Sequence, residues 1–186
     1  MIDFMEDVDD YLDWLSALTP KSLDRLAREP DLPLVVRRDI VTLPQVSPGT
    51  LDRLMDDLDL AGKAQIAYRP DARRSTLDRL ARCMSTHIKA AVLRNPGVGP
   101  SGSTITYLAM SAPNEAIREL AVTHRNAPKR LIELALCSAD PAMRSYVVHS
   151  PNITIDELKE LARDKDQTVA KAAKEQLESI ATDNIG

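Results

Sequence analysis

The residues of this chain that could carry out chemistry are few and scattered. Its three histidines stand at different positions of a repeating pattern, and none has a second His or Cys at a metal-ligand spacing: His87, His124 and His149. The acidic stretch 56–59 lacks the alternating oxygen ligands and the closing Glu of a calcium loop. Because an active site needs such groups in clusters, we predict no catalytic residue, no metal ligand and no cofactor, and we interpret the chain as a non-enzyme.

A basic residue recurs at one equivalent position, and this series is the strongest candidate for a binding site: Arg37, Lys63, Lys89, Arg118 and Arg144. If the repeats stack, these cations form a basic ladder along one side. The functional interpretation is a cationic groove for phosphates or for an acidic protein surface. The structural interpretation is local pairing, through Asp59–Lys63 and Asp140–Arg144 at i,i+4 or through carbonyls and cap carboxylates of the neighbouring unit. We favour the structural interpretation and keep the groove as the alternative.

The elements that must position this ladder follow from a repeat of 26 to 28 residues. A degenerate Leu-x-x-Leu-Ala string occurs six times, and its second leucines are Leu26, Leu54, Leu80, Leu108, Leu134 and Leu161. A fixed period in this range indicates stacked helical units that cover one another's apolar faces. The sequence therefore predicts one elongated all-α solenoid of about six two-helix units.

Each predicted unit contains a start signal for its second helix. The predicted N-cap residues are Pro33, Asp59, Ser85, Asn114, Asp140 and Asp166. Five of these six are good N-cap formers, and prolines such as Pro70 and Pro96 follow the helices and stop them. No segment alternates like a strand, so we predict no sheet.

The segments Leu77–Pro96 and Leu131–Pro151 resemble the leucine-rich repeat variant family, and their Val-Arg element is similar to that of HEAT-type helical repeats. The resemblance covers roughly residues 20–170. It implies a right-handed superhelix of alternating α-helices and short 3₁₀-like helices. Some members of the family carry an amino-terminal iron–sulfur module, but this chain has no cysteine before Cys83. Some HEAT-like solenoids are DNA-repair glycosylases, a likeness of architecture that does not imply function.

The ends of the chain differ in charge from its middle. Residues 1–19 hold six acidic residues and no Lys or Arg, whereas residues 20–155 have a net charge of +5. We predict an acidic amino-terminal capping helix over 1–19, a helical repeat domain over 20–166, and a carboxy-terminal capping helix and tail over 167–186. The alternative for 1–19, which includes Trp14, is a docking helix for a basic partner. The glycine-rich segment 97–103 is expected to be a flexible loop and a weak candidate for contact.

The two cysteines bear on the location of the protein. Cys83 and Cys137 lie two units apart, about 20 Å if stacked helices are about 10 Å apart, which is too far for a disulfide. We expect both to be buried small hydrophobic residues in a reducing cytosol. No stretch is long and apolar enough to span a bilayer, and the acidic amino terminus is unlike a secretory signal. These features predict a cytoplasmic protein without a membrane segment.

Together these observations predict a non-catalytic helical-repeat scaffold for protein–protein interaction, and an acidic protein is one kind of partner that the ladder would suit. The predicted contact residues are the five ladder cations and Trp14. The alternative is a nucleic-acid-binding solenoid that uses the same ladder; only six aromatic residues occur, and single-strand readers use aromatic side chains as stacking platforms. A nucleic-acid groove would bind with a steep salt dependence.

Overall fold

A computed structural model describes residues 8–183, and this part of the chain consists of helices joined by short connections. It contains thirteen α-helices, one 3₁₀ helix and no strand between residues 8 and 183. The prediction of an all-α protein without a sheet is confirmed for these residues. None of the helices described here combines the length and the apolar character needed to cross a membrane.

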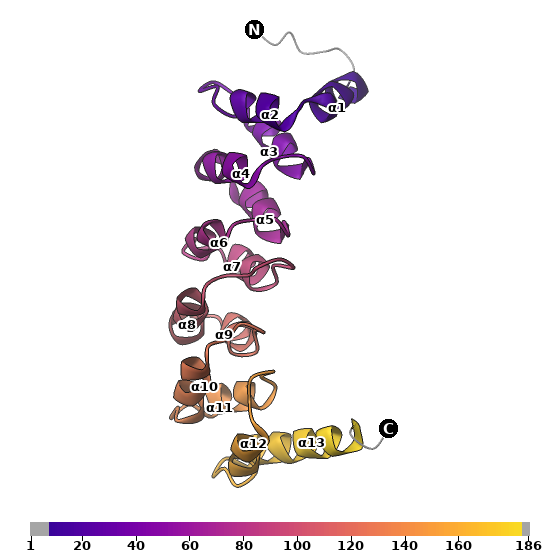
Figure 1. The fold of residues 1–186 in the computed structure, drawn as a ribbon. Helices are drawn as coiled ribbons and strands as arrows, with labels where there is room; N and C mark the ends of the chain where they lie inside the picture. The colour runs from indigo at the N-terminus through magenta and orange to yellow at the C-terminus, as the bar shows by residue number, and fades with distance from the viewer. Residues whose placement is uncertain (1–7, 184–186) are drawn as a thin grey trace.

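The helices form an elongated arrangement of two rows, with the two ends of the chain at opposite ends (Figure 1). We call the even-numbered helices the first row: α2 (Pro20–Leu26), α4 (Pro48–Leu54), α6 (Arg74–Leu80), α8 (Gly102–Ser111), α10 (Lys129–Leu136) and α12 (Ile155–Leu161). The second row contains α3 (Leu34–Thr42), α5 (Leu60–Tyr68), α7 (Thr86–Leu93), α9 (Glu115–Val122), α11 (Pro141–Val148) and α13 (Gln167–Asp183). Each second-row helix contacts the next one along the row.

The predicted helix starts of the second row are confirmed. The side chains of Asp59, Ser85, Asn114 and Asp140 each accept a hydrogen bond from a backbone N–H in the first turn of their helix. Asp166 does the same for α13, where it accepts from the N–H of Val169 at 3.2 Å. Each cap satisfies a backbone donor that has no partner within the helix, so the sequence fixes where these helices begin.

The short first-row helices are α-helices, and η1 (Met55–Asp57) is the one 3₁₀ helix between residues 8 and 183. The N–H of Leu23 bonds to the carbonyl of Thr19, and Leu51 and Leu77 repeat this bond four residues after Ser47 and Arg73. These i→i−4 bonds close α-helical rings. The expectation of 3₁₀-like short helices therefore holds only for η1. A seven-residue helix with a hydroxyl cap and a following proline has a complete α-turn and needs no tighter winding.

The first-row helices bury a series of branched aliphatic side chains, each four residues after its N-cap: Leu23, Leu51, Leu77, Ile105, Ile132 and Leu158. Burying each such side chain contributes about 1.5–3 kcal/mol. The prediction that Leu134 belongs to this core with Leu54 and Leu80 is wrong, because Leu134 is exposed. The N-cap of α10 is Pro128, which lies one residue closer to its leucine string than the N-cap does in the other units. One residue turns a helix by about 100°, so Leu131, Ile132 and Ala135 face inward instead.

The segment 97–103 is bound to the units on either side of it, although we expected a flexible loop. The Asn95 side chain accepts from the N–H groups of Gly97 at 2.9 Å and Gly99 at 3.4 Å, and donates to the Ala67 carbonyl at 2.6 Å. Gly99 adopts φ +68°, a conformation that favours glycine. A side chain at Gly97 would overlap the carbonyl of Pro70. The insertion is therefore a structural junction.

Helix α1 (Val8–Ala17) packs at the amino-terminal end of the rows. Leu15 is fully buried, and the Tyr11 hydroxyl donates to Asp39 of α3 at 3.1 Å. Trp14 is 37% exposed and lies with its ring centroid 6.2 Å from that of Tyr11. The acidic residues Asp3, Glu6 and Asp7 of the predicted cap lie outside the described residues. The division at residues 19 and 166 stays a prediction.

The two cysteines are both free thiols. Cys83 is half-buried and Cys137 is exposed, so the expectation of two buried cysteines is wrong. The turn of α10 that exposes Leu134 also carries the end of that helix, where Cys137 is the C-cap, toward solvent.

Candidate functional site

The basic ladder begins with Arg37, whose guanidinium is almost entirely used within the chain. Its Nε donates to the Leu32 carbonyl at 2.9 Å, and its Nη2 to the carbonyls of Glu29 at 3.2 Å and Pro30 at 3.1 Å. Its Nη1 bonds Asp57 Oδ2 at 2.9 Å. The residue is buried. This arrangement connects the end of one unit to the carboxylate of the next.

Arg144, at the other end of the ladder, repeats this arrangement in a more buried form. Its Nη1 donates to the Ser138 carbonyl at 2.7 Å. Its Nε and Nη2 bond the two oxygens of Asp164 at 2.7 and 2.9 Å. The side chains of Arg144 and Asp164 are only 6% and 9% exposed. The hydrogen bond from Arg144 lowers the pKa of the Asp164 carboxyl, so the pair stays ionised at neutral pH.

Both acidic partners occupy the same place in the repeat, two residues before the N-cap of the following second-row helix. We call this place the acid position; Asp57 precedes Asp59 there, and Asp164 precedes Asp166. In the three intervening units the acid position holds a residue without charge: Cys83, Ala112 and Ser138. Lys63, Lys89 and Arg118 therefore face acid positions without a carboxylate.

Within the ladder, these three central cations have fewer partners in the described chain than Arg37 and Arg144. Lys63 and Lys89, both half-buried, form no ion pair with any residue between 8 and 183. Arg118 Nη2 lies 3.6 Å from a carboxylate oxygen of Glu115, a side chain that is 75% exposed. Its Nε is buried and has no hydrogen-bond partner. A buried donor without a partner loses its hydration without compensation.

The predicted i,i+4 pairs within the ladder do not form. Asp59 is bound by Arg38 of the preceding unit, with Arg38 Nε 3.0 Å from Asp59 Oδ1, instead of by Lys63. Arg144 pairs with Asp164 and forms no ion pair with Asp140. The hydrogen bond from Arg38 is the largest cause of a lowered pKa at Asp59. Contacts between units thus replace contacts within one helix.

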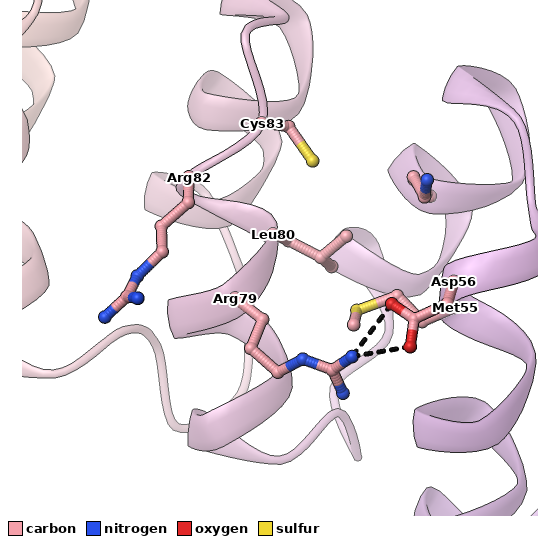
Figure 2. Close-up of a pocket in the computed structure, with 7 residues that line it drawn as sticks. Met55, Asp56, Arg79, Leu80, Arg82 and Cys83 are labelled. Atoms are coloured by element: carbon pink, nitrogen blue, oxygen red, sulfur yellow. Dashed lines mark hydrogen bonds and ion pairs between the residues drawn. The ribbon is translucent and has the colours of Figure 1, made fainter.

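A surface hollow of about 320 Å³ opens beside Lys63 (Figure 2). Arg79 reaches across it, and its Nη2 lies 2.8 Å from both oxygens of Asp56. Arg82 points away from this pair, and Cys83 forms part of the lining (Figure 2). With Lys63, Arg79 and Arg82 against Asp56, the lining carries a net positive charge and can attract an anion.

Hollows also lie beside the neighbouring ladder cations Arg37 and Lys89. The hollow at Arg37 has a volume of about 470 Å³ and contains Asp57 in its lining. The hollow at Lys89 has a volume of about 350 Å³ and has Ala112 at the acid position. The acid position in the lining is therefore a carboxylate at Arg37 and an uncharged residue at Lys63 and Lys89.

A second seam of side chains couples the first-row helices, and the sequence analysis missed it. Thr50 Oγ1 donates to Asp24 Oδ1 at 3.1 Å, and Thr76 bonds Asp52 in the same way. The N–H of Ser101 bonds Asp78 Oδ1 at 2.8 Å. The available signal was the string Leu-Asp-Arg-Leu, which starts at residues 23, 51 and 77. These carboxylates stabilise the stack and are not free for a ligand.

A third seam joins the ends of the second-row helices. Arg69 Nη1 donates to the Val41 carbonyl at 2.8 Å, and Asn152 Nδ2 donates to the Ala127 carbonyl at 3.0 Å. Together with Asn95, these side chains satisfy carbonyls that have no partner at helix ends. The polar side chains of these two seams therefore join neighbouring units. Lys63, Lys89 and Arg118 differ from them because they have no such partner in the described part of the neighbouring unit.

The histidines are not brought together. His124 is buried beside Gly99, and its Nδ1 accepts from the N–H of Asn126 at 3.0 Å, whereas His149 is exposed. The ring of His87 makes an edge contact with that of Tyr68. Within residues 8–183 no group of three or more His, Cys, Asp or Glu side chains could hold a metal ion.

No protein family, curated protein or solved structure matches the chain. Function is therefore inferred from the ladder and the residues around it.

Proposed function

We propose that this protein is a right-handed α-solenoid of six two-helix units that serves as a non-catalytic scaffold for a protein partner. The partner would bind along the edge that carries Lys63, Lys89 and Arg118, which we call the central ladder. The paired arrangement of first-row and second-row helices and the recurring N-caps support the solenoid. The resemblance to the leucine-rich repeat variant family, and a cytoplasmic location, are further parts of this proposal.

The observation that carries the proposal is the contrast within one ladder. Arg37 and Arg144 have a carboxylate at the acid position, whereas the three cations between them have none. A scaffold that needed this cation only for stacking would be expected to supply the acid in every unit. The central ladder instead presents positive charge, one cation per unit, with hollows at Lys63 and Lys89.

An acidic protein partner follows from the charge and from the hollows. Charged side chains that are only partly hydrated gain from opposite charge, which steers association and fixes its register. Trp14, an exposed aromatic residue on α1, is a second contact in this proposal, because aromatic residues are enriched at interfaces. We leave Arg37 and Arg144 out of the contact set because their donors are used inside the chain.

Nucleic acid is the alternative partner, and its support is a row of exposed arginines, with Arg25, Arg53 and Arg79 on the first-row helices and Arg82 in the turn that follows α6. Two of them face carboxylates, with Arg53 3.7 Å from Asp24 and Arg79 2.8 Å from Asp56. Interleaved carboxylates repel phosphates, so this row is a weaker site for a polyanion than the arginines alone would suggest.

The test compares proteins retained from cell lysate by the wild-type chain and by a Lys63→Ser, Lys89→Ser variant. Lys174→Ser is the matched control, since Lys174 is exposed on α13 and forms no ion pair with the residues that the structure describes. We expect one set of proteins to be retained by the wild type and the control and lost with the ladder variant, with or without nuclease. Equal retention by all three chains would refute the central ladder as the binding edge. Retention that nuclease abolishes would favour the nucleic-acid alternative.

A further inference from the structure

The filled acid positions show how a carboxylate engages a ladder cation. Asp57 Oδ2 accepts from Arg37 at 2.9 Å at the rim of a hollow, and its side chain is 58% exposed, so the bond forms at the surface. The hollow beside Lys63 has the same construction, with Cys83 where Asp57 stands and Arg79 where Arg53 stands. A carboxylate from another molecule can enter such a rim without opening the core.

We propose that the partner segment is an extended acidic peptide that places one carboxylate at each of the three acid positions held by Cys83, Ala112 and Ser138. This inference rests on the proposed function and specifies its ligand. The guest carboxylates would face Lys63, Lys89 and Arg118 as Asp57 faces Arg37. The pair of Asp57 and Arg37 thus shows the geometry that we expect for the contact with the peptide.

The spacing of the units determines the conformation of the peptide. Helices α5, α7 and α9 contact one another in succession, and packed helices lie about 8–10 Å apart. A polyproline II segment has three residues per turn and rises about 3.1 Å per residue, so every third side chain returns to the same side after about 9.3 Å. In a β-strand, residues three apart point to opposite faces. A carboxylate at every third residue of a polyproline II segment therefore matches one carboxylate per unit.

The rim of the second hollow suits the proline rings of such a segment. Met84, which is 94% exposed, and Pro113 stand beside Lys89 in the lining. An exposed methionine is an adaptable apolar contact. The site therefore offers an ammonium group for the carboxylate and an apolar rim for the residues between the carboxylates.

The probe is the peptide (Glu-Pro-Pro)₃-NH₂ carrying fluorescein on its amino terminus, measured by anisotropy with the full chain at low ionic strength, where screening is weak. The first control is a peptide of the same composition with its three glutamates adjacent. The second control replaces glutamate by glutamine. We expect the spaced peptide to bind at least fivefold more tightly than the adjacent-glutamate peptide, and the glutamine peptide not to bind.

A substitution at an acid position tests where the peptide lies. Cys83→Asp supplies the missing carboxylate beside Lys63 and should weaken binding of the spaced peptide at least threefold. Cys83→Asn, of the same shape but neutral, should leave binding unchanged. Circular dichroism confirms that each variant is folded; if Cys83→Asp is not, Lys63→Gln takes its place and should weaken binding to the same extent.

The outcomes separate this inference from the proposed function. Equal binding of the spaced and adjacent peptides would overturn the proposed spacing. Unchanged binding in Cys83→Asp or in Lys63→Gln would overturn the proposed acid positions. Either result would still allow a basic edge that binds an acidic protein. Failure of every acidic peptide, together with equal retention from lysate by the ladder variant, would overturn both. Tighter binding of a (dT)₁₂ oligonucleotide than of any peptide would replace the acidic peptide by nucleic acid.

Discussion

Replacing Asp164 with Asn removes the charge that compensates the buried guanidinium of Arg144. The substitution keeps the shape of the side chain and one oxygen acceptor. It also places an amide that donates hydrogen bonds beside a guanidinium that has only donors. Asp164 Oδ1 additionally accepts from the N–H of Asp166 at 2.8 Å, so the change reaches the start of α13. We expect the carboxy-terminal units to lose stability while the amino-terminal units keep theirs.

The magnitude follows from the burial of the pair. Removing one partner of a buried ion pair costs about 3–5 kcal/mol, because the other charge is left uncompensated. Since Asn keeps an acceptor, we expect the free energy of unfolding to fall by about 3 kcal/mol. The matched variant Asp57→Asn breaks the equivalent pair with Arg37, but Asp57 is 58% exposed. Solvent screens that pair, and Arg37 keeps its carbonyl acceptors, so we expect a loss of about 0–1 kcal/mol.

Urea unfolding measured with two probes distinguishes these expectations. Far-UV circular dichroism follows all helices, whereas fluorescence of Trp14, the only tryptophan, follows α1 at the opposite end from α11 and α13. Stacked units contact only their neighbours. Asp164→Asn should therefore move the dichroism transition to lower urea and leave the Trp14 transition almost unchanged.

The dependence on pH provides an internal check. The pKa of Asp164 is lowered in the folded protein, chiefly by the hydrogen bond from Arg144. Its contribution is therefore fully present above the unfolded pKa of about 3.9 and is lost as pH falls through the lower folded value. The difference in stability between the wild type and Asp164→Asn should be constant from about pH 5 to 8 and should shrink below about pH 4. Equal losses for Asp164→Asn and Asp57→Asn at neutral pH would refute the reasoning from burial.

Three further predictions concern the rest of the scaffold. Gly97→Ala should lower the free energy of unfolding by about 1–3 kcal/mol, because its Cβ overlaps a backbone carbonyl. Gly49→Ala in α4 should raise it by up to about 1 kcal/mol, because a Cβ there meets atoms only at 3.7 Å or more. Urea unfolding measures both changes. Burial, and next a neighbouring arginine, lower the pKa of His124, so stability should fall as pH drops below about 6.5 toward the lower folded value; His124→Gln should flatten the change in urea midpoint between about pH 7.5 and 5.5, and an unchanged slope would contradict this. Tyr11→Phe removes the hydrogen bond to Asp39 and should lower the stability of α1 by about 1 kcal/mol, seen as an earlier fluorescence transition of the single tryptophan; an unchanged transition would mean that packing alone holds α1.

Helix content and helix starts could be predicted from the sequence because they depend on neighbouring residues. Asp59, Ser85 and Asn114 act on N–H groups three residues away. The prolines that stop the helices also act locally. The repeat period also predicted stacked units; successive second-row helices are in contact, and the six-unit solenoid stays a proposal.

The inward and outward faces of one helix could not be predicted in the same way. The string Leu131–Ala135 matches its counterparts, yet Leu134 is exposed because the helix begins one residue closer to it. The exposure of Cys137 belongs to the same shifted helix. A periodic pattern gives the spacing of apolar residues, and the N-cap sets the rotation of the helix about its axis.

The sequence predicted where the ladder cations lie, but not which of them are paired with a carboxylate. The sequence identified the five ladder cations. It also shows that Cys83, Ala112 and Ser138 are not acidic. It could not show that Asp57 and Asp164 are the partners, because about twenty residues separate each acid from its arginine. Spacing within a helix suggested Asp59–Lys63 instead.

The sequence by itself therefore determined the helices, their caps and the period of the chain, all of which arise from contacts over a few residues. Tertiary structure decided which cations are neutralised, because that depends on the loop of the following unit reaching the helix before it. It also decided how strongly each pair is held, since Asp57 and Asp164 have the same chemistry and differ in their exposure to water. The sequence determines which residues carry charge, whereas packing determines how far water reaches each charged side chain.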